Sequence, residues 1–169
     1  MKVESMIKFK RVTKYNTDKK EKDQLKKLYL KAFPAEKRLP FFFFMTKTKD
    51  ENVDFLSIYD DDSWISMIYL VKHDKLTFIS YFAIDDSLRS KGYGGQVLEE
   101  IKKKYSNYAI CLTFEKIDSS ATNNEQRIKR KDFYKRNGFD KFNFYIKEAG
   151  IMYEFISHEK VLNPLNTLL

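Results

Sequence analysis

Hydrophobic spacing divides the first part of the chain into a strand, a helix and an apolar run. Residues 6–13 alternate between apolar and polar side chains, which predicts a first strand. Asp18 and Glu21 have the spacing of a capping box, in which the Asp side chain accepts from the Glu amide. The helix that follows ends at Pro34 and carries its apolar residues at helical spacing: Leu25, Leu28, Tyr29, Ala32 and Phe33.

An apolar run at Phe41–Met45 follows Pro40 and is too short for its period to be read. It fits a second short helix, or the wall of a binding pocket. Core packing is the favoured interpretation.

Three strands come next, separated by polar turn clusters. The first two are Val53–Tyr59 and Trp64–Lys72, and the third is Leu76–Ile84. The third is almost uniformly apolar, which predicts a strand at the sheet centre that is covered on both faces.

The second half alternates helices and strands. A helix runs to about Lys104, and a buried-type strand at Tyr108–Phe114 follows across it, which is the spacing of a parallel crossover. A second helix spans about Glu125 to Arg136, and Asn137-Gly138 closes it. Residues 141–146 and 151–157 are expected to be final antiparallel strands.

This order predicts an α/β fold with a mixed, mostly antiparallel sheet, a central parallel strand pair and flanking helices. Neither a repeat nor a Gly/Ser-rich or Pro-rich linker interrupts the sequence. We therefore expect one domain over residues 1–169, with a short C-terminal tail from about residue 159.

Composition supports a globular chain with a core filled by rings. Hydrophobic residues make up 43% and charged residues 33% of 169 residues, and the chain holds 15 Phe and 11 Tyr. The net charge of +8 invites a nucleic-acid interpretation, but lysines alternate with acids along the whole chain. A solvated basic surface is the simpler interpretation, and attraction to an anionic ligand is the other.

Cysteine and histidine usage excludes several site types. The single Cys111 rules out an internal disulfide framework and suits a reducing compartment. His73 and His158 are too far apart in sequence to form a metal site without several carboxylates, so no metal is expected. The N-terminus has no apolar signal core and no segment reaches the ~20 apolar residues that span a bilayer. The expected location is the cytoplasm, without membrane association.

The clearest chemical signal is the turn Arg89-Ser90-Lys91-Gly92-Tyr93-Gly94-Gly95, between a buried strand and a helix. Glycines let the backbone approach a ligand closely, and the helix start offers unpaired amides and the positive end of its dipole. Arg89 and Lys91 add positive charge, so the turn predicts a phosphate or pyrophosphate cradle. It matches neither a Walker A loop nor a dinucleotide fingerprint. Glycine used only for close strand–helix packing is the alternative.

Context adds a family resemblance. Arg89-x-x-Gly92-x-Gly94, five residues after Ile84, resembles the acetyl-coenzyme A loop of the GCN5-related N-acetyltransferase (GNAT) superfamily. Phe133-Tyr134-Lys135-Arg136-Asn137-Gly138-Phe139 resembles that family's Phe-Tyr-x-x-x-Gly-Phe segment at the end of its last helix. The resemblance covers residues 76–140, and the order of the flanking elements extends it over the chain.

The resemblance implies an acetyl-coenzyme A-dependent transferase and assigns functions to matching positions. Phe82, Ala83 and Ile84 correspond to backbone that pairs with the pantetheine arm beside a parted strand. Arg89, Ser90, Lys91, Gly92, Tyr93, Gly94 and Gly95 would hold the pyrophosphate. Tyr134 matches the tyrosine that protonates the departing thiolate.

One position departs from the family's common pattern. Many members carry Asn seven residues before the Tyr, where this chain has Arg127, and Ala three residues after that Asn, where it has Arg130. Our hypothesis is that Arg127 or a neighbour meets a coenzyme phosphate instead. A solvated helix face is the competing interpretation.

Direct transfer also needs a group that removes a proton from the attacking amine. Glu115, at the end of the strand that flanks the expected slot, is the first candidate, and a solvated loop acid beside Lys116 is its alternative. Glu36 is a weaker candidate. Cys111 is expected to pack in the core rather than to act as a nucleophile, and His73 is expected to be exposed in a hairpin turn.

The favoured function is an N-acetyltransferase that moves acetyl from acetyl-coenzyme A to a primary amine by direct transfer in a ternary complex. The alternatives are a coenzyme-binding module without turnover and, less favoured, a small basic nucleic-acid binder, for which no recognition motif is present. Polyamines, antibiotics, amino acids and protein amino termini all stay open as acceptors, and a homodimer would be common in the family.

Overall fold

The computed structural model describes residues 5–159 and places thirteen elements in the order expected for a mixed α/β chain. They divide into two compact units. The first holds the residues up to Lys72 together with Ile79–Glu100, and the second holds His73–Phe78 together with the residues from Ile101 onward. The predicted tail from about residue 159 lies almost wholly outside the described residues.

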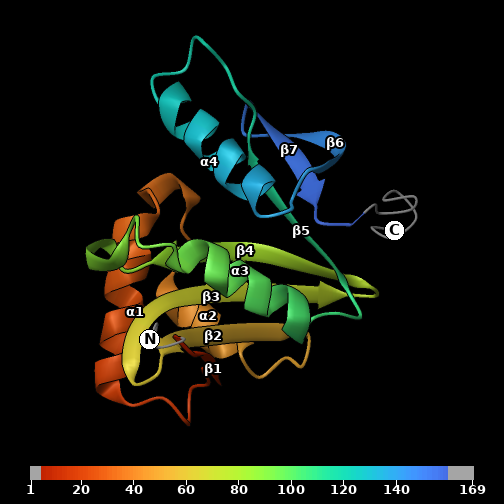
Figure 1. Cartoon of the computed structure of the whole chain (residues 1–169). Coiled ribbons are helices and arrows are strands. Elements are labelled where there is room, and N and C mark those ends of the chain that lie inside the picture. Colours follow the sequence, from red (N-terminus) through yellow and green to blue (C-terminus); the bar gives the residue numbers. More distant parts are fainter. Residues whose placement is uncertain (1–4, 160–169) are drawn as a thin grey trace. The chain divides into compact units, whose positions relative to one another are not determined.

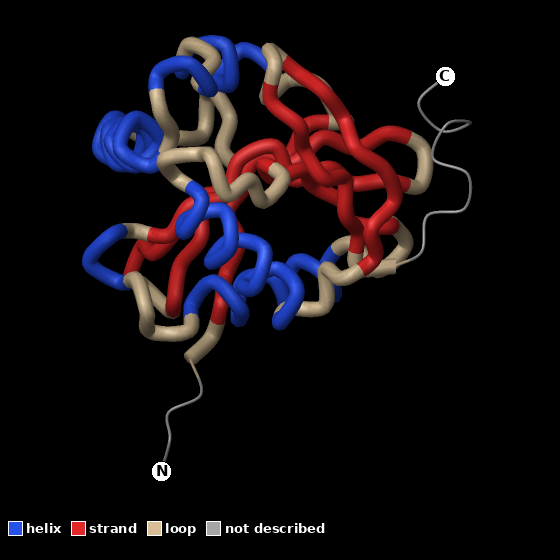
Figure 2. The backbone as a smooth tube through the Cα atoms, turned by 90° about the horizontal axis from the view of Figure 1, so that it is seen from above, coloured by secondary structure: helices blue, strands red, loops and turns tan. Residues whose placement is uncertain are grey.

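Helices and strands are joined by short connections (Figure 2). The elements are β1 (Ile7–Arg11), α1 (Lys19–Ala32), η1 (Ala35–Lys37), α2 (Phe41–Lys47), β2 (Val53–Asp60), β3 (Ser63–His73), β4 (Leu76–Ile84), η2 (Asp86–Leu88), α3 (Tyr93–Lys104), β5 (Ala109–Glu115), α4 (Asn124–Arg136), β6 (Lys141–Glu148) and β7 (Ile151–Ser157).

The strands form one seven-stranded sheet in the order β1-β2-β3-β4-β5-β7-β6 (Figure 1). The β1–β2, β2–β3, β5–β7 and β6–β7 pairs are antiparallel, and β4 and β5 are parallel. This confirms the predicted mixed sheet with a central parallel pair. The β4–β5 ladder joins Leu76–Phe78 to Ala109–Cys111, and those three residue pairs belong to the second unit.

In the first unit, α1 and α2 cover one sheet face and α3 covers the other (Figure 1). Phe55, Met67 and Tyr69 point toward α1 and α2, where Phe44 packs edge-on against Tyr29 at 4.9 Å and against Tyr81 at 5.1 Å between ring centroids. Rings therefore fill this core, as the composition indicates.

Helix α1 begins and is anchored as its sequence predicts. The Asp18 carboxylate accepts from the Glu21 amide at 2.8 Å, which confirms the N-cap contact. Glu21 is itself buried, and its charge is met by Lys10 Nζ at 2.6 Å and by the Tyr59 hydroxyl at 2.8 Å. The hydrogen bond to Glu21 raises the pKa of Lys10. One carboxylate thus ties α1 to β1 and β2.

The apolar run after Pro40 is the short helix α2, and it buries only part of its aromatic surface. Phe44 and Met45 are buried, whereas Phe42 is 71% exposed. Strand β4 likewise differs from the expectation that both its faces are covered, because Phe78, Tyr81, Phe82 and Ile84 are only half-buried. Apolar content indicated a central strand correctly but overstated its burial.

The second unit has its own smaller core. Leu76, Cys111 and Phe155 are buried there, with Phe144 stacked on Phe155 at 4.7 Å between ring centroids. The expected strand and helix bounds of this half agree with the structure to within two residues at each end.

Phe44→Ala should lower the free energy of unfolding by about 3–5 kcal/mol, because it opens a cavity at the centre of the aromatic cluster. Phe42→Ala, two residues earlier and mostly exposed, should change it by about 0.5 kcal/mol or less. Urea unfolding followed by circular dichroism measures both changes. Equal losses in the two variants would contradict the packing described.

Candidate active site

The turn from β4 into α3 bends the backbone through two left-handed residues. Ser90 has φ of 63° and Gly92 has φ of 82°. A Cβ built at Gly92 would meet nothing within 4 Å, so this glycine serves the backbone angle and not a shortage of space. The turn therefore presents an open stretch of main chain just before the helix.

The first turn of α3 leaves its amides without partners inside the helix. The Gly92 carbonyl accepts from the Gln96 amide at 3.3 Å, which makes Gly92 the residue that caps the helix start. The amides of Tyr93, Gly94 and Gly95 precede the first helical donor and point out of the helix end. Together with the helix dipole they form a site suited to an anion.

Ion pairs brace the chain immediately before this turn. Arg89 Nη2 lies 2.9 Å from Asp86 Oδ1, and Lys31 of α1 also pairs with Asp86. The hydrogen bond from Lys31 is the main cause that lowers the pKa of Asp86, and Arg89 adds to it. Arg89 thus has a partner on η2, just before the turn, and Lys91 is exposed.

The Tyr93 side chain tethers the start of α3 to the sheet. Its hydroxyl donates to Asp60 Oδ2 at 2.6 Å, and this hydrogen bond is the main cause that raises the pKa of Tyr93. Strand β4 is fixed on the same unit, because the Ala83 carbonyl accepts from the Ser66 hydroxyl at 2.7 Å. Phe82–Ile84 and Arg89–Gly95 are therefore held by contacts inside the first unit.

Tyr134 lies in the second unit, on the last turns of α4, among aromatic rings. Its ring stacks parallel to Phe114 at 6.4 Å and lies 5.1 Å from Phe133 and 6.0 Å from Phe139 between centroids. Burial raises the pKa of Tyr134 to about 12, against a smaller lowering by Arg130. Its hydroxyl makes no hydrogen bond to the described residues of its own unit. Phe139 is buried, and Phe133 is half-buried.

A tight stop fixes the end of α4 just beyond Tyr134. Gly138 has φ of 85°, and the Phe139 amide donates to the Tyr134 carbonyl at 2.9 Å. The Lys102 ammonium binds the Asn137 carbonyl, and a Cβ on Gly138 would meet Lys102 Nζ at 2.9 Å. The backbone angle therefore requires glycine here, whereas the Lys102 ammonium, at the end of a flexible side chain, could move away from a Cβ.

Glu115 and Arg127, predicted separately, form one buried network with Asn123. Arg127 Nε lies 2.7 Å from Glu115 Oε2, and that oxygen also accepts from Asn123 Nδ2 at 3.1 Å. Arg127 donates further to Asn123 Oδ1 at 2.9 Å and to the Lys116 carbonyl at 2.9 Å. Glu115 is 2% exposed and the Arg127 side chain 11%. Neither a solvated acid nor a solvated helix face describes these two residues.

The remaining candidates are placed as follows. Cys111 is buried, and burial raises the pKa of its thiol to about 12, which agrees with core packing. His73 is exposed at the end of β3, and Glu36 is exposed on η1. Residues 5–159 hold no group of histidine, cysteine and carboxylate side chains that would bind a metal. No helix in that range is long and apolar enough to cross a membrane.

Sequence reasoning missed the partners that hold these residues. Asn123 carried no signal beyond its place in a polar loop, and Asp60 and Asp86 looked like ordinary turn acids. The one usable hint was Arg127 itself, a long cation on a helix whose start follows the end of an apolar strand by few residues. A cation in that position can reach back to a carboxylate at the strand end.

Comparison with known proteins identifies the family. The acetyltransferase (GNAT) domain matches residues 51–141, which is more than half of the chain. This range contains the β4–α3 turn, β5 and α4. The comparison with curated protein sequences gives no match.

Solved structures agree on the fold. An acetyltransferase described as of the GNAT family from Bacteroides thetaiotaomicron is 24% identical with a TM-score of 0.73, covering 91% of this chain and 88% of that one. An aminoglycoside 6'-N-acetyltransferase complexed with coenzyme A is 13% identical with a TM-score of 0.67, covering 92% and 99%. A GNAT acetyltransferase from Elizabethkingia anophelis with acetyl-CoA bound is 16% identical with a TM-score of 0.60, covering 89% and 96%. With the fold and the domain match in agreement, this chain belongs to the GNAT family of acetyltransferases.

Proposed function

We propose that the chain is an N-acetyltransferase that moves acetyl from acetyl-coenzyme A to a primary amine by direct transfer in a ternary complex. The observation that carries the proposal is the β4–α3 turn, where left-handed Ser90 and Gly92 precede the first amides of α3, which have no acceptor within the helix. The relatives with coenzyme A or acetyl-coenzyme A bound support the choice of cofactor.

In this proposal the main chain of the turn holds the pyrophosphate. The amides of Tyr93, Gly94 and Gly95 donate to its oxygens, and the helix dipole favours the negative charge. Lys91 and Arg89 add charge from the rim of the turn. The Tyr93 side chain does not bind the cofactor, because its hydroxyl is engaged by Asp60 and fixes the helix start.

The pantetheine arm is proposed to pair with the backbone of Phe82–Ile84. The β5 ladder accounts only for Leu76–Phe78, so these last residues of β4 lie beyond it. Backbone pairing would hold the thioester by groups that carry no charge and select for an extended chain.

Tyr134 is proposed as the general acid. The amine nitrogen attacks the thioester carbonyl, the C–N bond forms, and the C–S bond breaks as the Tyr134 hydroxyl gives its proton to the leaving thiolate. The raised pKa keeps this hydroxyl protonated at neutral and moderately alkaline pH. Regaining a proton from solvent restores the acid after each turnover.

Glu115 was predicted as the base, and its contacts favour a positioning function. Both Arg127 and Asn123 donate to one of its oxygens, and the network fastens the start of α4 to the end of β5. Arg127 and Tyr134 are seven residues apart, so they lie on the same side of α4, two turns from each other. We therefore propose that the ion pair of Glu115 with Arg127 sets the position of Tyr134. The attacking amine then loses its proton to water.

Calorimetry with acetyl-coenzyme A tests the cofactor site. Lys91→Ala should weaken binding about tenfold, because a charge-assisted contact to phosphate is lost. Lys8→Ala, which removes the same charge from an exposed position on β1, should leave the dissociation constant unchanged. Absence of any heat with the wild-type chain would refute the proposed cofactor.

Tyr134→Phe should lower kcat by about 10²–10⁴-fold while the KM for acetyl-coenzyme A stays within about twofold, since only proton transfer is removed. A general acid works while protonated, so activity falls as pH rises through its pKa. With that pKa raised to about 12, the wild-type kcat should show no falling limb from this group below about pH 10. The release of free thiol from acetyl-coenzyme A, followed with a panel of amines and over a range of pH, measures the kcat of the variant and the pH dependence of the wild-type kcat.

Tyr145→Phe removes an exposed hydroxyl from β6 of the same unit and serves as the control. A Tyr134→Phe enzyme with wild-type kcat on a good acceptor would exclude Tyr134 as the acid. Saturable cofactor binding with no acetylation of any amine would instead indicate a coenzyme-binding module.

A double-mutant cycle distinguishes the two functions considered for Glu115, which are to act as the general base and to position Tyr134. If the network positions Tyr134, Glu115→Gln and Arg127→Ala should each lower kcat and stability. The double variant should be no worse than the worse single one, because both changes break one buried unit. Suppose instead that Glu115→Gln alone abolishes the acidic limb of the kcat/KM profile while Arg127→Ala keeps it. Glu115 would then be the base.

A further inference from the structure

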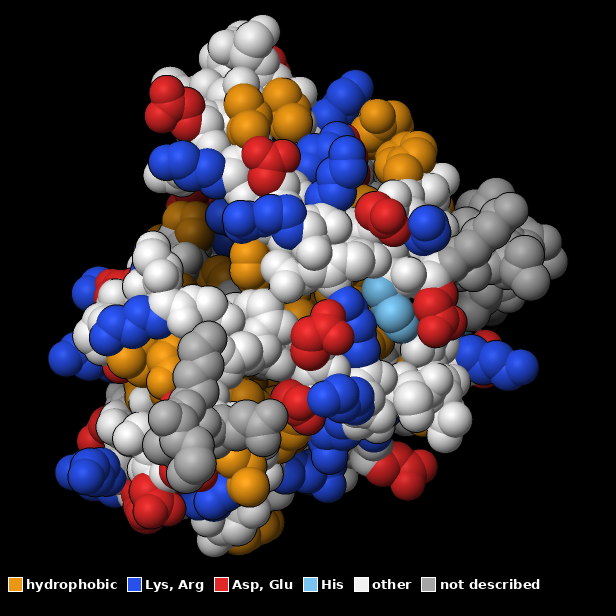
Figure 3. All heavy atoms as spheres, in the orientation of Figure 1, with side chains coloured by type: hydrophobic (Ala, Val, Ile, Leu, Met, Phe, Trp, Pro, Cys, Tyr) orange, Lys and Arg blue, Asp and Glu red, His pale blue; other side chains and the backbone are white. Residues whose placement is uncertain are grey.

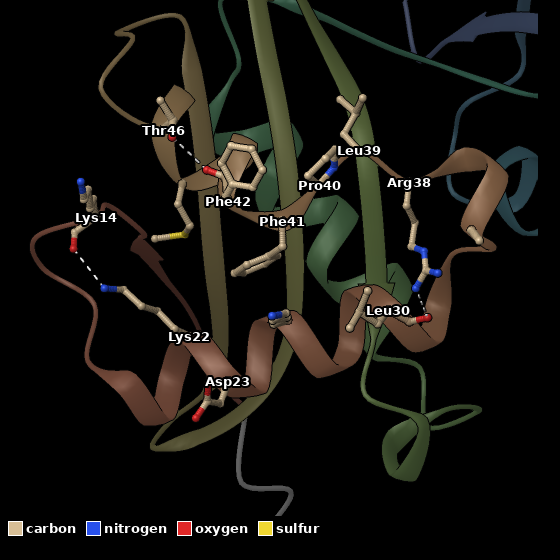
Figure 4. Close-up of a pocket in the computed structure, with 13 residues that line it drawn as sticks. Lys14, Lys22, Asp23, Leu30, Arg38, Leu39, Pro40, Phe41, Phe42 and Thr46 are labelled. Carbon is tan, nitrogen blue, oxygen red and sulfur yellow. Dashed lines mark hydrogen bonds between the residues drawn. The ribbon is translucent and has the colours of Figure 1, made fainter.

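A groove of about 800 Å³ in the first unit runs beside α1 (Figure 4). None of its lining residues is among those proposed above for cofactor binding or catalysis. It is open to solvent along its length and lies between α1, the segment before α2, and α2 itself. Its apolar surface comes from Leu30, Leu39, Pro40, Phe41, Phe42 and Met45. Phe42 is 71% exposed, and Leu39 and Leu30 are almost half exposed, so a wide apolar area faces water.

Positive charge borders this groove at both ends (Figure 4). Lys14, Lys22 and Lys26 line it together with Arg38, and Asp23 is the one acidic side chain among the lining residues. Lys22 Nζ donates to the Lys14 carbonyl at 3.1 Å, and Arg38 Nη1 donates to the Leu30 carbonyl at 3.0 Å. These carbonyl contacts fix the positions of Lys22 and Arg38 without cancelling their charge.

The walls of the groove are held in place by partly buried hydrogen bonds. The Tyr29 hydroxyl donates to the Leu39 carbonyl at 2.8 Å, and the Tyr81 hydroxyl donates to the Lys37 carbonyl at 2.9 Å. Both rings belong to the aromatic core, so the segment from η1 to Pro40 is anchored from below. The groove is therefore formed before anything binds, which lowers the entropic cost of binding.

We propose that this groove docks an acidic amphipathic helix of a partner protein. From Lys22 to Leu30 is eight residues of α1, or about 12 Å, a little more than two turns of a partner helix. Apolar side chains at i, i+3 or i+4 and i+7 would enter the groove between Leu30, Leu39 and Phe42. Acidic side chains flanking them would meet Lys22 and Lys26 at one end and Arg38 at the other.

A synthetic probe tests the proposal on the full chain. The probe is an 18-residue fluorescein-labelled helical peptide with Leu at i, i+3 and i+7 and Glu at its flanking positions, measured by anisotropy. We expect saturable binding with a dissociation constant of order 10 μM that weakens as salt rises. The same peptide with Lys for every Glu, or with Ser for every Leu, should not bind.

Adjacent lysines on α1 provide matched variants. Lys26 lines the groove and Lys27 does not, yet both are exposed and carry the same charge. Lys26→Glu should weaken the probe at least tenfold, and Lys27→Glu should weaken it less than twofold. Phe42→Ser should also weaken it about tenfold, because it removes apolar contact and leaves the charges intact. Unchanged thermal unfolding shows that each variant is folded.

Several outcomes would overturn the proposal. These are no saturation up to 1 mM, equal weakening by Lys26→Glu and Lys27→Glu, or equal binding of the Ser-substituted peptide. Displacement of the probe by micromolar dodecanoate would reassign the groove to a small anionic amphiphile. Sedimentation with phosphatidylserine vesicles that Lys26→Glu abolishes, without peptide binding, would reassign it to a lipid surface.

Discussion

The first amides of α3, which have no acceptor within the helix itself, are the constraint on which the functional interpretation of this chain depends. A helix cannot pair its own first backbone donors within the helix. The left-handed angles at Ser90 and Gly92 turn the chain so that Gly92 caps through its carbonyl alone. Tyr93 is anchored to Asp60, and Asp86 is braced by Lys31 and Arg89. Side-chain hydrogen bonds and ion pairs thus hold this turn in place.

The second organising feature is the burial of carboxylates. In each unit a buried carboxylate is paired with a cation and a hydrogen-bond donor from the same unit. A buried charge is tolerated only with a partner and further hydrogen bonds. Glu21 meets Lys10 and the Tyr59 hydroxyl, and so joins α1 to the sheet of the first unit. Glu115 meets Arg127 and Asn123, and so joins α4 to β5 in the second. Figure 3 shows that most other charges are interspersed, basic beside acidic, over the face in view, in keeping with a solvated basic surface.

Local patterns predicted the elements well. The bounds of β4, the end of α3 and the cap at Asp18 follow from spacing within a few residues, so the sequence alone contains that information. The GNAT resemblance rested on two short motifs and is confirmed by the domain match, and the mixed sheet is confirmed by the strand pairing. The functions assigned to Tyr134 and to the Arg89–Gly95 turn stay predictions.

Those local patterns could not predict the contacts between residues of different helices and strands. The pairing of Glu115 with Arg127 joins residues of different elements, and α4 has no apolar stripe from which its orientation could be read. Arg127 was therefore expected to contact a coenzyme phosphate or to lie on a solvated helix face. The half-burial of β4 escaped prediction for a similar reason, since apolar content does not reveal which faces are covered. Partners distant in sequence decided both features.

Chemical-shift changes of the backbone amides in the β4–α3 turn are the most direct test of the proposed anion site at the start of α3. In a titration of the ¹⁵N-labelled chain with coenzyme A, the amides of Tyr93, Gly94 and Gly95 should move most. They should saturate at the dissociation constant found by calorimetry, and Gly138 should serve as a glycine outside the turn. Binding that leaves these three amides unmoved while signals elsewhere shift would contradict an anion site at the start of α3.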